Sequence, residues 1–121
     1  MKNVRAPFYK SFVYAFEGIL SALKSERNMM IHFVIAILVV TFGFIFNITA
    51  TEWLVCLILF ALVISSELVN TAFEMLVDLC EPNKNPKAKF CKDVAAGAVL
   101  VNAIIAAVAG LIIFVPYVLN L

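Results

Sequence analysis

Four hydrophobic blocks follow one another along the chain, and they differ in periodicity. Residues 8–25 place apolar side chains on one helical face, at intervals of three and four residues, with polar side chains opposite. This pattern is typical of a helix that lies in the interface of a membrane. The other three blocks are apolar nearly all round and long enough to cross a bilayer, so they predict transmembrane helices over 29–46, 53–79 and 94–118.

The connections between these blocks are short and polar. Residues 47–52 (NITATE) predict a turn that carries no Lys or Arg. Residues 80–93, with two prolines, two asparagines and four lysines, predict a loop in which helix can resume towards the end. The chain is therefore expected to form one all-α membrane domain over residues 1–121, with three transmembrane helices and an N-terminal amphipathic surface helix.

The composition agrees with a membrane protein and excludes an ordinary soluble domain. Of the 121 residues, 64% are hydrophobic and 14% charged, whereas soluble domains average roughly 25% charged residues. The net charge of +1 shows no basic excess that would indicate nucleic-acid binding. With one histidine and no CxxC spacing, the cysteines cannot complete a zinc site, and we interpret them as packing residues: Cys56, Cys80 and Cys91.

The positions of the basic residues predict how the chain is oriented. All nine Lys and Arg residues lie either before the first transmembrane block or within 80–93. Segments rich in Lys and Arg remain on the cytosolic side of a membrane. We therefore expect a multi-pass protein of the cell membrane, with its N-terminus and polar loop in the cytosol and its C-terminus outside.

A stripe of polar residues interrupts the second transmembrane block. Glu67, Glu74 and Asp78 fall within about 20° of one line on a helix, and Asn70 lies about 60° to the side. Counted from Trp53, Glu67 lies ~21 Å deep and Glu74 ~31 Å, against a hydrocarbon core of ~30 Å. A charged group inside hydrocarbon costs at least ~2.5–3.5 kcal/mol, so such residues usually mark a functional site.

Two chemical interpretations of this stripe follow from the residues. Carboxylates at a membrane surface, faced by lysines from the next loop, suit a phosphate ligand bound with Mg²⁺, and hence phosphoryl transfer from a nucleotide to a lipid alcohol. The usual nucleotide motifs are absent, so a proton- or cation-coupled transporter stays open. Interhelical hydrogen bonding is the structural alternative for the stripe, and it is our interpretation of Asn102 in the third block.

Three segments resemble the signature blocks of one family of membrane enzymes. SERNMMIH (25–32), ELVNTAFEMLVDL (67–79) and KDVAAGAVL (92–100) are similar to those of the prokaryotic diacylglycerol kinase and undecaprenol kinase family. The resemblance extends over nearly the whole chain. It implies a homotrimer with sites between neighbouring subunits, and an ATP- and Mg²⁺-dependent lipid kinase.

The resemblance also implies roles for individual residues. Glu67 is implied as the catalytic base, with Asn70 beside it in the site. Glu26 and Glu74 are implied as ligands of the magnesium ion. The implied nucleotide-binding residues, with Lys92 on phosphate, are Tyr14, Lys92, Asp93 and Asp78. Asp78 can equally be a solvated residue at a helix end, and Arg5 and Lys10 compete for a basic position ahead of the surface helix.

The acceptor lipid is predicted from two further features. The pattern ERNxxxH, which ends at His32, resembles the undecaprenol kinase branch, whereas the diacylglycerol kinase branch tends to carry an acid there. We therefore interpret His32 as a branch marker and assign it no catalytic role. Met29, Met30 and Phe73 are expected to face the lipid, and these apolar groups cannot satisfy the ester carbonyls of diacylglycerol. The predicted product is undecaprenyl phosphate, with diacylglycerol as the alternative, weaker substrate.

Overall fold

The computed structural model describes residues 6–121, and its regular secondary structure over that range is helical throughout. The helices, in chain order, are α1 (Phe8–Ser25), α2 (Arg27–Phe46), α3 (Ala50–Cys80) and α4 (Pro86–Leu119). Helices α2, α3 and α4 are long and apolar enough to cross a membrane. The prediction of an all-α chain, with three helices long and apolar enough to span a membrane and one further helix before them, is confirmed.

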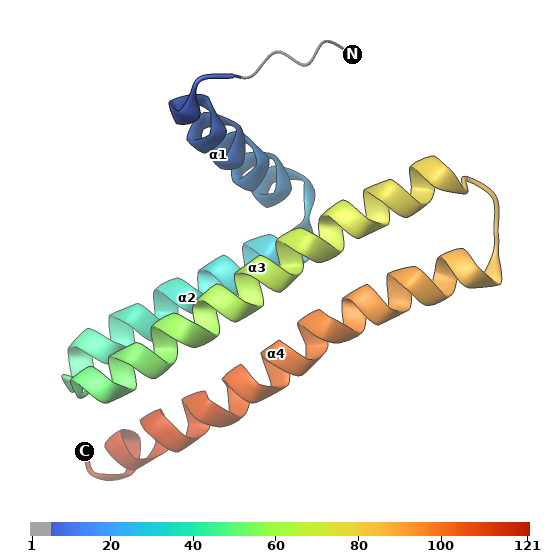
Figure 1. Ribbon diagram of the computed structural model, residues 1–121. Coiled ribbons are helices and arrows are strands. Elements are labelled where there is room, and N and C mark those ends of the chain that lie inside the picture. The colour runs from blue at the N-terminus through green and yellow to red at the C-terminus, as the bar shows by residue number, and fades with distance from the viewer. Residues whose placement is uncertain (1–5) are drawn as a thin grey trace.

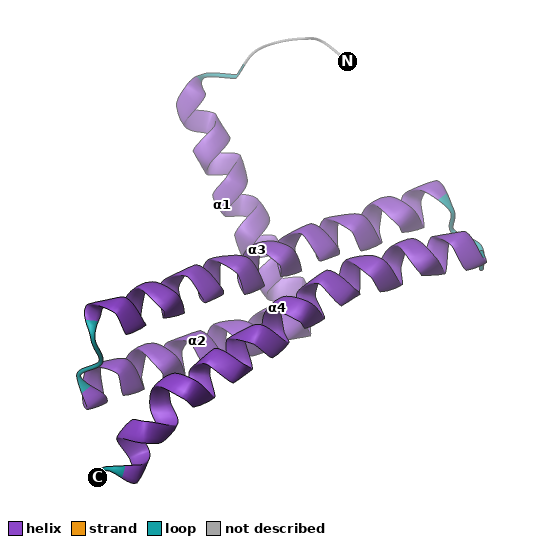
Figure 2. Cartoon of the chain, turned by 60° about the horizontal axis from the view of Figure 1, so that its bottom comes forward, coloured by secondary structure: helices purple, strands orange, loops and turns teal. Residues whose placement is uncertain are grey.

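Helix α3 is the central element of the bundle. It runs antiparallel to α2 on one side and to α4 on the other, while α1 leaves the bundle at a steep angle (Figure 1). A second view shows the same separation of α1 from the three long helices (Figure 2). Because α3 contacts both neighbours, a polar residue on α3 can meet side chains from either side.

A tight turn joins α2 to α3. Asn47 takes the left-handed conformation, with a φ of 52°, and closes α2. Thr49 then caps α3: its Oγ1 accepts from the Glu52 N–H at 3.2 Å, and its own N–H donates to the Glu52 carboxylate at 2.9 Å. This capping box starts α3 at Ala50, three residues before the start expected from hydropathy alone.

Helix α4 begins earlier than the sequence pattern predicted. Asn85 caps it by accepting from the Lys87 N–H at 2.9 Å, and Pro86 occupies the first turn, where its missing N–H is not needed. The end of the predicted loop 80–93 is therefore helical. As a result, Lys89, Lys92 and Asp93 are held on a rigid element close to the end of α3.

Tight packing is concentrated where the α2–α3 turn meets the end of α4, which we call the turn end. Ile48, Cys56 and Ile113 form a buried cluster there, and Trp53 covers it. A Cβ added to Gly43 would lie 2.5 Å from Trp53 Cη2, so the indole needs a glycine on α2 to reach this position. The opposite end of the bundle, from Glu67 to the α3–α4 loop, is called the polar end.

Side-chain hydrogen bonds join α3 to α4 along their length. At the turn end, Tyr117 Oη donates to Glu52 Oε1 at 2.5 Å. Near mid-helix, Asn102 Nδ2 donates to the Leu62 carbonyl at 3.1 Å, which confirms the interpretation of Asn102 as an interhelical hydrogen-bonding residue. Elsewhere, the outward faces of the three long helices are largely apolar and exposed, as expected of helices that contact lipid or another protein chain.

Candidate active site

The polar stripe of α3 runs from a buried end to an exposed end. Glu67 is 2% exposed and Asn70 is 7% exposed. Glu74, one to two turns further on, is half-buried, and Asp78 is exposed. Burying a charged carboxylate without a partner is strongly unfavourable, so Glu67 requires a polar neighbour from another element.

That neighbour comes from α2. His32 Nε2 lies 3.3 Å from Glu67 Oε2. His32 was interpreted from the sequence as a branch marker with no role in the site. A signal for the contact was nevertheless present. The short turn pairs α2 with α3, so His32, 14 residues before the end of α2, and Glu67, 17 residues after the start of α3, lie at similar depth. The helical period of α2 alone, which relates His32 only to Glu26, could not reveal this contact.

Asn70 connects the buried and exposed parts of the stripe. Its Nδ2 donates to Glu74 Oε1 at 3.1 Å, one turn along α3. Its Oδ1 is buried and finds no hydrogen-bond partner among residues 6–121. A buried amide oxygen without a donor is unfavourable by about 1–3 kcal/mol, so this atom indicates a ligand or another chain that completes the site.

Three of the predicted nucleotide-binding residues lie where α3 ends and α4 begins. Lys92 Nζ forms an ion pair with Asp78 Oδ1 across the two helices. Lys89 Nζ forms another with Asp93 Oδ2 along α4. These residues line a hollow of about 640 Å³ that also contains Lys84 and Glu81. Lysines and carboxylates around one open hollow suit a ligand that carries phosphate.

The remaining predicted residues lie on or beside α1. Tyr14 is 55% exposed on that helix, and Glu26 is half-buried at the junction of α1 and α2. Over the described range, neither forms a hydrogen bond or ion pair between its side chain and the stripe of α3. Lys10 is exposed on α1, and Arg5 lies outside the described residues.

The side chains near Glu74 fit a magnesium ion that also binds phosphate. In residues 6–121, no three Asp, Glu, His or Cys side chains form a closed metal cluster. Mg²⁺ usually takes only one or two protein carboxylates and fills its other positions with water and phosphate oxygens. Glu74, beside the unpartnered oxygen of Asn70, provides donor atoms of this kind.

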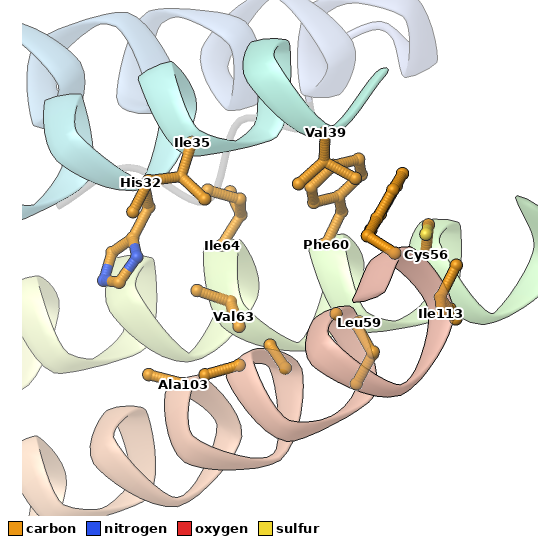
Figure 3. A pocket seen from close by; sticks show the side chains of 14 residues that line it. His32, Ile35, Val39, Cys56, Leu59, Phe60, Val63, Ile64, Ala103 and Ile113 are labelled. Carbon is orange, nitrogen blue, oxygen red and sulfur yellow. The ribbon is translucent and has the colours of Figure 1, made fainter. Parts of the chain in front are cut away.

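An apolar cavity of about 260 Å³ lies between α2, α3 and α4, on the side of Glu67 that faces the turn end (Figure 3). His32 lies at one end of it, and Val39, Phe60 and Ile113 line its length. Apart from the imidazole and the Cys56 thiol, the side chains that line it are hydrocarbon or glycine. The cavity can therefore accommodate an apolar chain, but it offers few donors to a polar one.

One expectation about the lipid-facing residues was wrong. Met29 was predicted to face lipid, but it is completely buried at 0% exposure. It lies on α2 one turn before His32, on the side of that helix that packs into the protein. Met30 and Phe73 are 45% and 46% exposed, as expected for residues that can face lipid.

Comparison with known proteins assigns the chain to a family of membrane enzymes. The family model for prokaryotic diacylglycerol kinase matches residues 13–114, and the chain belongs to this family. The chain is 43% identical over 115 residues to a protein of Bacillus subtilis named undecaprenol kinase, covering 95% of this chain and 94% of that one. It is 38% identical over 112 residues to a diacylglycerol kinase of Synechocystis, covering 92% of this chain and 64% of that protein.

Proposed function

We propose that this protein is a membrane lipid kinase that transfers the γ-phosphate of ATP to undecaprenol, giving undecaprenyl phosphate and ADP. The observation that carries the proposal is the buried carboxylate of Glu67. It lies inside an apolar helix, between a hydrocarbon-lined cavity and a lysine-lined hollow. Family membership and the name of the Bacillus relative support the same reaction.

Glu67 is proposed as the base for the lipid hydroxyl. Its carboxylate accepts the hydroxyl proton while the alcohol oxygen forms a bond to the γ-phosphorus and the bond to the ADP oxygen breaks. Asn70, next along the stripe, offers its unpartnered Oδ1 to a donor of the bound substrate. Both side chains are held by the rigid helix α3, so their separation is fixed before substrate arrives.

The nucleotide is proposed to bind at the polar end. Lys92 contacts phosphate, and Asp93, Asp78 and Tyr14 lie around the nucleotide. Glu74 and Glu26 are the proposed ligands of Mg²⁺. When bound, this ion neutralises charge on the phosphates during transfer. The hollow is lined by lysines and carboxylates, which supports this assignment, since a nucleotide with its metal ion carries negative charge on the phosphates and positive charge on the ion.

The lining of the cavity favours a polyisoprenoid alcohol over diacylglycerol. Diacylglycerol has two ester carbonyls near its hydroxyl, and burying them without donors is unfavourable. Undecaprenol carries only a hydroxyl on a branched hydrocarbon chain, and His32 is the one strong hydrogen-bonding side chain in this lining. Diacylglycerol remains the proposed weaker substrate, since an apolar pocket usually discriminates between two similar substrates by only ~1–3 kcal/mol.

Proton- or cation-coupled transport, the rival prediction, is not supported by the residues described. A transporter needs an ionisable site that can be reached from both faces of the membrane. The cavity between Glu67 and the turn end is lined almost entirely by hydrocarbon, which provides no polar route across.

The proposed orientation places the N-terminus and polar end in the cytosol, where ATP is available, and the C-terminus outside.

The active form is proposed to be a homotrimer. Glu26 and Tyr14 make no polar side-chain contact with the α3 stripe in the described chain, and the three long helices expose much apolar surface. A neighbouring subunit would supply the missing residues.

Mixing subunits that carry Glu67→Gln with subunits that carry Glu26→Gln should then restore part of the activity. Verified mixed oligomers that stay inactive would mean that one chain supplies both residues.

The direct test of the reaction is a competition assay in detergent micelles. Purified protein is given labelled ATP, Mg²⁺ and equimolar undecaprenol and diacylglycerol, and the lipid products are separated. Undecaprenyl phosphate should dominate. A product mixture dominated by phosphatidic acid would overturn the choice of lipid, and the absence of any phosphorylated lipid, with ATP bound, would overturn the kinase proposal. The Glu67→Gln protein serves as the control for contaminating kinases.

A further inference from the structure

His32 occupies the junction between the apolar cavity and the polar stripe. Its Nε2 lies 3.3 Å from Glu67 Oε2, while the same imidazole forms one end of the cavity (Figure 3). The two side chains are 20% and 3% exposed, so little solvent reaches the contact. Within residues 6–121, no other side chain is within hydrogen-bonding or ion-pairing distance of the Glu67 carboxylate.

The protonation required of Glu67 determines what His32 must do. A base has to be an ionised carboxylate, which can only accept hydrogen bonds. Nε2 of His32, 3.3 Å away, is placed to donate a hydrogen to Oε2 of Glu67 whenever the ring carries one on that nitrogen. This donation partly compensates the burial of the negative charge and fixes the rotation of the carboxylate. Oε1 is left as the oxygen that can accept a proton from another molecule.

The position of the ring adds a geometric constraint. A chain in the cavity that extends towards the polar end reaches His32 before it reaches Glu67. An alcohol at the tip of that chain would arrive beside the carboxylate whose orientation the imidazole controls. A hydrophobic side chain at position 32 would remove that control and would leave Glu67 buried without a donor.

We propose that His32 is the positioning residue for Glu67: it holds Oε2 through Nε2–H and so presents Oε1 to the hydroxyl of a lipid alcohol that enters through the apolar cavity. This inference rests on the proposed kinase function. It differs from a purely structural role, in which His32 would only join α2 to α3. In the proposed role, the effect of His32 on turnover depends on the Glu67 carboxylate.

Two substitutions at position 32 separate these roles. His32→Gln keeps an Nε2 donor at similar reach, whereas His32→Leu keeps the approximate volume and removes the donor. We expect His32→Leu to lower kcat by about 10- to 100-fold, with the KM for ATP within about threefold of wild type. His32→Gln should keep kcat within about threefold. Phe33→Leu, a change at the neighbouring half-buried position of α2, is the matched packing control.

A double-mutant comparison completes the test. In the Glu67→Gln background, His32→Leu should lower the residual rate by less than about twofold, because its partner carboxylate is already absent. Equal rates for the Gln and Leu variants, or full additivity of the two substitutions, would overturn the positioning role. Turnover of the wild-type protein tests the kinase proposal separately, so failure of one proposal cannot be mistaken for failure of the other.

Discussion

The two ends of the helical bundle differ in whether their polar groups have hydrogen-bond partners within the chain. At the turn end, the Glu52 carboxylate accepts from the Thr49 N–H and from Tyr117 Oη, and the aromatic rings around it pack closely. At the polar end, the amide oxygen of Asn70 has no donor among residues 6–121, and lysines line an open hollow. One end is complete within a single chain, whereas the other requires a ligand or partner. This contrast separates residues that maintain the fold from the residues proposed to carry the chemistry.

The largest effect is expected from Glu67→Gln at the polar end. The amide keeps the volume of the side chain, but it cannot accept the hydroxyl proton. Lipid phosphorylation should fall by about 10²- to 10⁴-fold, the contribution typical of a general base. ATP binding, measured by equilibrium titration, should stay near that of the wild type. Turnover like that of the wild type would remove the base assignment.

The next largest effect is expected from Lys92→Met, which keeps the aliphatic part of the side chain and removes its charge. The KM for ATP should rise about tenfold or more, because a charge-assisted contact to phosphate is lost. Lys87→Met is the matched control, since Lys87 lies on the same helix but does not line the hollow. Equal effects of the two substitutions would indicate general electrostatic attraction and contradict a specific contact.

At the turn end, substitution should affect stability and leave the chemistry intact. Gly43→Ala would force the new methyl group against the indole of Trp53, and overpacking of this kind usually destabilises by about 1–3 kcal/mol. Gly97→Ala is the control, since a Cβ there would meet no side chain within 4 Å among the described residues. Thermal unfolding in detergent should separate the two variants, while kcat per folded protein stays unchanged. A loss of kcat in Gly43→Ala would show that the two ends are coupled.

The smallest effect is expected from Asp78→Asn. Its ion pair with Lys92 is partly exposed, and exposed pairs contribute little. If Asp78 only orients Lys92, the KM for ATP and kcat should change by less than about threefold. A tenfold change in the steady-state KM would instead place the Asp78 carboxylate in direct contact with the nucleotide or its metal.

Some features of the molecule follow from local sequence, and others require the fold. The three apolar runs and the burial of the Glu67 region could be predicted, because hydrocarbon imposes strict limits on length and charge. The start of α4 at Pro86 could not be set by hydropathy, since the cap of Asn85 is a polar, local signal inside a segment that looks like a loop. The buried position of Met29 likewise depends on which face of α2 meets α3.

The candidate site shows the same division. Sequence motifs predicted Glu67, Asn70 and Lys92 as site residues. The contact of His32 with Glu67 joins two helices and emerges only from their antiparallel pairing. The approach of Lys92 to Asp78 depends in the same way on the short α3–α4 connection. Relations within one helix follow from its period, whereas relations between helices depend on how the connecting turns set their register.

The length of helix α3 fixes the distance between the groups that it carries. Its 31 residues extend over roughly 46 Å, about 16 Å more than the hydrocarbon thickness of a bilayer. One uninterrupted rod therefore carries both the group proposed to act on the lipid hydroxyl and the groups proposed to act on the phosphates. Because the helix is not interrupted between them, the number of residues that separates these groups fixes their spacing along the helix axis. A single-residue insertion or deletion between Glu67 and Glu74 would rotate one carboxylate by about 100° relative to the other. Substitutions on this segment should therefore be tolerated more readily than changes in its length.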